Sequence, residues 1–489
     1  MPARPVPEPS RPAGREIPAR VPEAGGTVAL PSAPFSGATA LALSTYDLGR
    51  RPAALAELAT ALRATGWQVR LADLAVDPWD DASLAGVDLV VWSLPMHTAT
   101  RLMAPMVPQI RALAPRARLM AVGLYAVLNR SVLAEAGVEV SDHGTGIGVA
   151  ARRTLRSTPP MAGLDGQPAA EGAGVWRSSR DGLPPLDRYA RLVLADGTER
   201  LVGATAASVG CRHLCRHCPI VPVYSGRFRA VAVERVLAEV AGLVACGAGH
   251  VSFTDPDFLN GPAHARRVAR AMHERFPQLS FDLTARISHL RDHRHLLAEL
   301  RDAGCVLITS AVESFDPLTL QRLDKGHTAE DVEVVVAACR HAGIGLEATF
   351  VAFTPWTSVE SYRQFLDRVD ALGLAGSVAP VQYGVRLLVG ARSALLDLPE
   401  IAASVGEFDP ELLVHPWSHT NPYVDELYRR VSAVVRETAR SPAGPAERQA
   451  VHARLRALVG SAAPRPANTH VEAAPQPATI AWLTEPWFC

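Results

Sequence analysis

Three cysteines of this chain lie close together, and their spacing indicates a metal site. Cys211 and Cys215 have three residues between them, and Cys215 and Cys218 have two. Three thiolates on one loop can bind three irons of a four-iron, four-sulfur (4Fe–4S) cluster and leave the fourth iron without a protein ligand. Because such an iron can chelate a small molecule, the spacing favours a catalytic cluster. A structural zinc site would need a fourth ligand, which His213 or His217 in the same loop would have to supply.

The composition is that of a large protein with balanced charge. The chain has 489 residues, 48% of them hydrophobic, so we expect about two or three domains with large buried cores. The 49 basic residues balance 49 acidic ones, which argues against a nucleic-acid partner. The seven cysteines do not fit a secreted disulfide framework, and no apolar run has the length of a membrane span. We therefore expect a cytoplasmic protein with no membrane partner.

Alternating strands and helices begin after a Pro- and Arg-rich segment, residues 1–36, that we expect to be disordered. Residues 37–150 predict a doubly wound, Rossmann-like parallel sheet, because buried strands alternate there with helices. The expected strands are residues 38–44, 69–74, 88–93 and 118–122. Ligands of such sheets bind at the carboxyl ends of the strands, which here carry residues 44–47 and 93–97.

A second alternation predicts a partial (β/α)6 barrel of the TIM type over residues 196–390, after a linker at residues 151–195. The six expected strands are residues 201–208, 250–254, 279–284, 305–310, 346–351 and 378–383. Residues 391–440 are expected to form a helical extension, and residues 441–489 a loose linker and C-terminal tail. Because the tail ends in apolar and aromatic residues, we expect it either to dock over the barrel mouth or to form an ordinary terminal strand.

Polar side chains recur at the carboxyl ends of the expected barrel strands, which share one rim. After the cysteine loop, the titratable and hydroxyl residues of the rim are, in chain order, Asp255, Asp257, Arg286, Glu313 and Ser314. The later strand ends, where a substrate pocket would open, carry Trp356, Gln382 and Arg386. A purely structural explanation does not account well for the whole set, so we expect the chemistry of the protein at this rim.

The combination of these motifs resembles the radical S-adenosylmethionine (SAM) enzymes. The resemblance rests on the cysteine loop after a first strand, the acidic turn of Asp255 and Asp257, and residues 311–314 and 323–328. It covers the barrel. A doubly wound domain ahead of such a barrel is similar to the subgroup that carries a cobalamin-binding domain.

A narrower resemblance is to the radical SAM family named for its CUAEP or CCAEP tail. The segments that carry it are residues 217–224, 255–260, 349–357 and 382–388. The sequence stops at Cys489 without that tail. Our hypothesis is that Cys489 is the first residue of the tail and that the next codon is a UGA meant for selenocysteine, which sequencing past the stop would test.

The N-terminal domain departs from the pattern of cobalamin-binding relatives. Those that displace the lower base of the cofactor use an Asp-x-His-x-x-Gly motif. The matching turn here, residues 44–49, contains no histidine. Cobalamin stays a possible cofactor, but the missing histidine argues against it, and the domain could instead pack on the barrel or recognise a substrate.

The resemblance also implies roles for the rim. The three cysteines would bind the cluster, and its open iron would bind the amino and carboxylate groups of SAM. One electron would then break a sulfur–carbon bond and yield a 5′-deoxyadenosyl radical. An electron donor such as flavodoxin or ferredoxin would reduce the cluster. The family leaves the substrate and the catalytic residues unknown.

Individual SAM contacts follow from the same resemblance. Asp255 or Asp257 would accept hydrogen bonds from the SAM ammonium, and Arg286 would pair with its carboxylate. Glu313 and Ser314 would hold the ammonium or the ribose hydroxyls. Two further candidates are Lys325, the single lysine of the chain, and His217. Lys325 would place a positive charge near the carboxylate or cap a helix, and His217 would stack near the adenine.

Two other classes of protein also fit the sequence. The cysteine loop could serve a non-catalytic iron–sulfur module that senses redox state, or a zinc-stabilised interaction scaffold. Anaerobic reconstitution separates the three. Catalysis predicts iron together with reductive cleavage of SAM, a sensor predicts iron without cleavage, and a scaffold predicts one zinc ion per chain.

Overall fold

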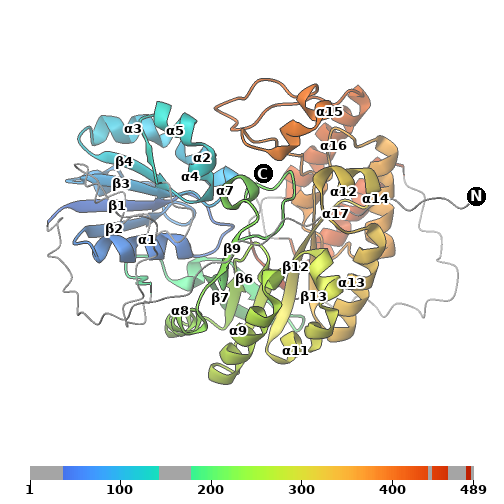
Figure 1. Ribbon diagram of the computed structural model, residues 1–489, viewed down its shortest axis with the longest axis horizontal. Coiled ribbons are helices and arrows are strands. Elements are labelled where there is room, and N and C mark those ends of the chain that lie inside the picture. The colour runs from blue at the N-terminus through green and yellow to red at the C-terminus, as the bar shows by residue number, and fades with distance from the viewer. Residues whose placement is uncertain (1–36, 142–177, 439–442, 461–480, 486–489) are drawn as a thin grey trace, which may run out of the picture.

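The structure is a computed structural model that describes residues 37–141, 178–438, 443–460 and 481–485. An N-terminal α/β domain lies beside a larger barrel, and helices of the C-terminal extension lie against the barrel (Figure 1). This confirms the predicted fold class. The expected disordered segment, residues 1–36, and Cys489 lie outside the described residues. Within the described part, no helix is long and apolar enough to cross a membrane.

The N-terminal domain is a five-stranded sheet whose strands are all parallel, in the order β2-β1-β3-β4-β5. The strands are β1 (Thr39–Ser44), β2 (Gln68–Asp73), β3 (Leu89–Ser93), β4 (Arg118–Val122) and β5 (Glu139–Val140). Alternate residues of β1 enter two separate cores: Leu41 and Leu43 face one, and Ala40 and Ala42 face the other. Helices therefore cover both faces of the sheet, as a doubly wound fold requires.

The helices of this domain follow the strands in turn. They are α1 (Ala53–Arg63), α2 (His97–Met103), α3 (Met106–Leu113), α4 (Leu124–Leu128) and α5 (Arg130–Glu135). Two of them begin at the carboxyl end of a strand: α2 follows β3, and α4 follows β4. This end of the sheet faces the barrel, and α4 packs against α7 (Val221–Tyr224).

The barrel is a seven-stranded sheet in the order β13-β12-β11-β10-β7-β6-β14. Its parallel strands are β7 (Glu199–Thr205), β10 (His250–Phe253), β11 (Ser280–Thr284), β12 (Cys305–Glu313) and β13 (Gly345–Phe350). The outer helices are α8 (Val233–Ala245), α9 (Pro262–Arg275), α10 (Ile287–Asp292), α11 (Leu297–Asp302), α12 (Pro317–Leu323), α13 (Ala329–Ala342) and α14 (Val359–Ala371). A large apolar core lies between these strands and helices.

The sixth expected strand, residues 378–383, is a 3-10 helix at Pro380–Tyr383 instead. Pro380 has no backbone N–H for a strand ladder. The side chain of Gln382 takes the place of a strand backbone, because its Oε1 accepts a hydrogen bond from the Phe350 N–H at 2.9 Å. The chain rejoins the sheet at a single parallel bridge between Phe353 and Arg386. The sixth position of the barrel is thus closed by one side chain and one bridge.

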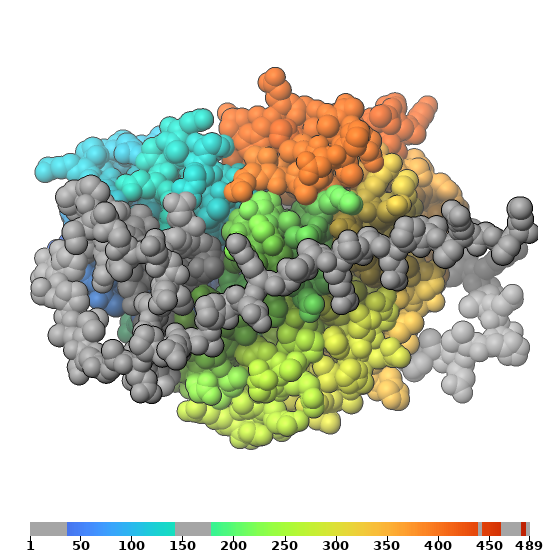
Figure 2. All heavy atoms as spheres, viewed as in Figure 1, coloured from blue at the N-terminus to red at the C-terminus, as the bar shows by residue number. Residues whose placement is uncertain are grey.

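The C-terminal part contains more helix than the sequence indicated. Helices α15 (Pro399–Ala402) and α16 (Pro422–Thr438) lie in the expected extension, but α17 (Pro445–Leu458) lies in the segment expected to be loose. The Glu447 side chain accepts a hydrogen bond from the Gly444 N–H and so caps α17. In Figure 2 the extension, in orange, rests on the barrel next to the N-terminal domain. His97 Nε2 contacts the Leu412 carbonyl oxygen there at 2.8 Å.

The apolar tail docks as an edge strand of the barrel sheet. β14 (Trp482–Leu483) pairs antiparallel with β6 (Arg191–Val193), which pairs antiparallel with β7. Of the two expected arrangements, the described residues of the tail adopt the terminal strand. β6 itself lies in the segment expected to be a linker.

Candidate cluster and cofactor site

The cysteine loop leaves the barrel rim between two short strands. β8 (Ser208–Gly210) pairs antiparallel with β9 (Phe228–Ala230), and this ribbon encloses the loop. Gly210 starts the loop with φ +81°, and a Cβ at this position would collide with the carbonyl oxygen of Arg227. A glycine is therefore needed where the chain turns into the loop.

All three cysteines of the loop are free thiols that influence one another. Cys215 is buried, and Cys211 and Cys218 are half-buried. Burial, together with the charges of Cys215 and Cys211, raises the pKa of Cys218 to about 11. Burial also raises the pKa of Cys211. The thiolate forms of such buried cysteines need a stabilising partner, such as a positive charge or a metal ion.

Arg286 supplies a positive charge at the loop. It precedes α10, at the carboxyl end of β11, and its Nη1 lies 2.8 Å from Cys215 Sγ. Its Nη2 donates to the Lys325 carbonyl oxygen. Arg286 is 8% exposed, so its charge acts on the sulfur with little screening by water.

Glu313 joins His217, the residue before the third cysteine, to the only lysine of the sequence. Its Oε1 lies 3.0 Å from His217 Nε2 and 3.2 Å from Lys325 Nζ. Burial alone would raise the pKa of Glu313, but the charges of Lys325 and His217, together with their hydrogen bonds, outweigh burial and lower it. Glu313 also has φ +67°, a left-handed conformation that costs energy in a residue with a side chain. Such strain is typical of a functional position.

The two aspartates after β10 have protein partners. Asp255 accepts hydrogen bonds from the Ala207 N–H at 2.9 Å and from the Ser208 hydroxyl at 2.5 Å. Burial raises its pKa to about 6. Asp255 therefore fixes the chain where β7 leads into the cysteine loop.

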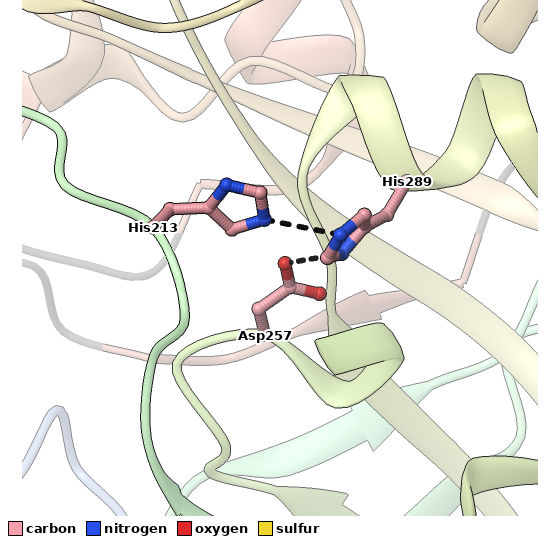
Figure 3. Close-up of side chains that lie close together, drawn as sticks. All are labelled: His213, Asp257 and His289. Atoms are coloured by element: carbon pink, nitrogen blue, oxygen red, sulfur yellow. Dashed lines mark hydrogen bonds and ion pairs between the residues drawn. The ribbon is translucent and has the colours of Figure 1, made fainter. Parts of the chain in front are cut away.

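Asp257 belongs to a second group that sequence reasoning did not assemble. Asp257 Oδ1 accepts a hydrogen bond from the Leu259 N–H at 3.1 Å. Its Oδ2 lies 2.7 Å from His289 Nδ1, and His289 Nε2 lies 3.0 Å from His213 Nε2 (Figure 3). His289 stands three residues after Arg286, one helical turn further along. This three-residue spacing could have linked His289 to the site, because it places the side chains of Arg286 and His289 near the same part of the rim.

A cavity between the two domains reaches the cysteine loop. It opens to solvent and is lined by Cys218 and His217 from the loop and by His97 and Tyr125 from the N-terminal domain. Arg386 also lines it, held by Asp425 at 3.1 Å. A cavity between domains and next to the cysteine loop is a natural place for a ligand.

The other expected pocket residues lie elsewhere. Gln382 is buried at the sheet, as described above, and Trp356 stacks under the Arg322 guanidinium at 4.7 Å. Ser314 and Glu313 line a separate cavity near α14. The His217–Glu313 contact thus connects two cavities.

Comparison with known proteins identifies the barrel. Residues 206–366 match the radical SAM superfamily. An uncharacterized methyltransferase of Pyrococcus horikoshii is 23% identical over 209 residues, 42% of this chain and 44% of that protein. The hopanoid C-2 methylase of Rhodopseudomonas palustris is 26% identical over 149 residues, 30% of this chain and 28% of the methylase. The chain thus spans less than half the length of these relatives.

Solved structures match both domains. TsrM from Kitasatospora setae, a radical SAM methyltransferase solved with cobalamin and a 4Fe–4S cluster, has a TM-score of 0.56 at 19% identity, covering 76% of each chain. OxsB, a cobalamin-dependent SAM radical enzyme, has a TM-score of 0.61 at 11% identity, covering 86% of this chain and 71% of OxsB. At these identities the likeness concerns the fold. Residues 206–366 thus match the radical SAM superfamily, and the described part of the chain shares the overall fold of TsrM and OxsB.

Proposed function

We propose that this enzyme binds a 4Fe–4S cluster through Cys211, Cys215 and Cys218, cleaves SAM reductively and so starts radical chemistry on a substrate. The observation that carries the proposal is the set of three free thiols on one rim loop, with the Arg286 guanidinium 2.8 Å from one sulfur. Three thiolates suit three irons of such a cluster and leave one iron open. When bound, the cluster would supply an electron to SAM.

In this proposal the residues around the loop divide into two groups. Arg286 and Asp255 support the loop, because their polar atoms are occupied by the loop and its surroundings. Glu313, Ser314 and His217 would contact SAM. Glu313 is suited to an ammonium group or ribose hydroxyls because its lowered pKa keeps it ionised at neutral pH.

The contacts of Lys325 and His217 support a specific role for each residue. Lys325 is 3% exposed and paired with Glu313, so it would set the position and charge of that carboxylate. His217 is held by the same carboxylate and lines the interdomain cavity next to Cys218. Its ring would stack with the adenine, and the substrate would enter through this cavity.

The residues of the N-terminal domain do not fit a cobalamin whose lower base is displaced by a histidine. The turn after β1, residues 44–49, has no histidine, and α4 packs against α7 at the interface. A reductant, such as a flavodoxin or ferredoxin, and a substrate would be the partners, and free thiols suit a reducing compartment such as the cytoplasm.

The test is anaerobic reconstitution of the full chain with iron and sulfide, followed by reduction in the presence of SAM. We expect four irons per chain and formation of 5′-deoxyadenosine and methionine, measured by chromatography. Iron without cleavage would favour a redox sensor. One zinc ion bound by thiolates, with no iron taken up, would favour a structural scaffold.

A further inference from the structure

Two histidines and an aspartate converge beside the cysteine loop. His213, Asp257 and His289 can each offer one ligand atom, and these atoms all lie within 4.8 Å of one another. They come from three elements: the cysteine loop, the turn after β10, and α10. Figure 3 shows the three side chains pointing toward a common centre. The proposed function assigns no role to this group.

The Asp257 carboxylate in this group is deeply buried and incompletely satisfied. Asp257 is 0% exposed and His289 is 7% exposed. Asp257 Oδ2 and His289 Nδ1 lie 2.7 Å apart, yet within the described part of the chain neither atom takes part in a hydrogen bond. A buried carboxylate needs a cation or a full set of hydrogen bonds. A metal ion between these side chains would provide such a cation even where His289 is not protonated.

The distances suit a small transition-metal ion. His213 Nε2 and His289 Nε2 face each other at 3.0 Å. Bonds of about 2.0–2.1 Å from zinc to nitrogen or oxygen place two ligands of a tetrahedral site about 3.3 Å apart. The two histidines would have to move apart by only a few tenths of an ångström to admit the ion. Asp257 now contacts the other nitrogen of His289, Nδ1, so its carboxylate or the His289 ring would also have to turn for all three residues to bind the same ion.

We propose that His213, His289 and Asp257 bind one divalent transition-metal ion, zinc or iron(II), separate from the 4Fe–4S cluster. Two imidazoles and one carboxylate are a ligand set that both ions accept, and they leave at least one coordination position open. Because His213 lies between Cys211 and Cys215, the ion would fasten the cysteine loop to α10 and to the turn after β10. It would thereby position two of the cluster ligands.

Zinc K-edge X-ray absorption tests this, because it detects zinc separately from the cluster iron. The anaerobically reconstituted full-length protein would be treated with one equivalent of zinc and desalted. We expect one zinc ion per chain with nitrogen or oxygen ligands at about 2.0–2.1 Å and no sulfur ligand at about 2.3 Å. Elemental analysis of the same sample reports the iron content, so the cluster is assessed independently.

Variants locate the site. Asp257→Asn and His289→Gln should each lower the affinity for zinc by at least about 10-fold while the protein stays folded by circular dichroism. His293→Gln is the matched control, because His293 directly follows α10 and its ring centroid lies 6.1 Å from that of His289. This control should bind zinc like the wild type.

Three results would overturn the metal site. They are wild-type protein that retains no zinc, zinc bound through sulfur, and folded Asp257 and His289 variants that retain zinc as well as the His293 control. A normal iron content and SAM cleavage alongside any of these would leave the proposed function intact. Loss of iron and of SAM cleavage in the wild type would instead count against the proposed function.

Discussion

The Arg286 guanidinium and the Cys215 sulfur are 2.8 Å apart, although 71 positions separate them in the chain. The contact forms because β11 ends at the same rim as the cysteine loop. A positive charge beside a metal-bound thiolate favours the state with more negative charge. In a cluster that must accept an electron, Arg286 would therefore favour the reduced form.

This relationship predicts an electrochemical effect. Arg286→Met should lower the midpoint potential of the bound cluster by on the order of 60 mV, equivalent to about 1.4 kcal/mol for one electron. A redox titration monitored by electron paramagnetic resonance measures the shift. Arg291→Met is the control, since Arg291 lies on α10 and pairs with Asp331 at 2.8 Å. Equal potentials in both variants would rule out a direct influence of Arg286.

The cysteines themselves give a second prediction. Cys215→Ala should reduce iron retention and SAM cleavage by at least about 100-fold, because it removes a direct ligand. Cys246→Ala should retain both, since Cys246 is exposed and lies at the end of α8. Iron assays and 5′-deoxyadenosine yields distinguish them. A Cys215 variant that still cleaved SAM at the wild-type rate would contradict the cluster assignment.

The Glu313 pair predicts a pH-dependent difference in stability. A carboxyl group whose pKa is lowered by folding stabilises the protein above its unfolded pKa, about 4.3, and loses that contribution as the pH falls toward the folded value. Glu313→Gln leaves the buried Lys325 without its anion and should cost about 3 kcal/mol at neutral pH. The difference from wild type should shrink below pH of about 4.3.

Urea unfolding at neutral and acidic pH measures this difference. Glu360→Gln is the control, because the pair of Glu360 with Arg363 lies on the exposed surface of α14. It should resemble the wild type at both pH values. A constant difference for Glu313→Gln at all pH values would show that its charge does not stabilise the fold.

The docked tail gives a fourth prediction. Glu485, next to β14, pairs with Arg50 of the N-terminal domain at 2.5 Å. Burial raises the pKa of Glu485 to about 7, against the opposing charge of Arg50. Arg50→Ala should release residues 481–485, at a cost of about 3 kcal/mol, and more strongly as the pH rises, because an ionised Glu485 would then be buried without a cation.

Hydrogen exchange at residues 481–485 measures this release. Arg118→Ala provides the comparison, since its pair with Glu139 is largely exposed and should contribute at most about 1 kcal/mol. If both variants left exchange at the tail unchanged, the Arg50–Glu485 pair would not be what holds β14 in place.

Much of the architecture could be predicted from local patterns. The alternation of apolar strands with helices indicated both α/β domains, because burial on both faces of a parallel sheet leaves continuous apolar runs such as β3. The sixth strand was the exception. Its apolar residues are buried as expected, but the segment forms a 3-10 helix in place of a strand, and the Gln382 side chain makes the hydrogen bond to the sheet. Apart from Pro380, which has no backbone N–H, the periodicity of apolar residues gives no sign of this change.

The sequence by itself determined the spacing of Cys211, Cys215 and Cys218, because covalent neighbours on one loop must stay close in any fold. Only the tertiary structure decided which groups surround them. The Arg286–Cys215 contact, the convergence of His213 with Asp257 and His289, and the docked tail join residues far apart in the chain. Such contacts depend on how the strands and helices pack, and packing is a property of the whole chain rather than of any segment.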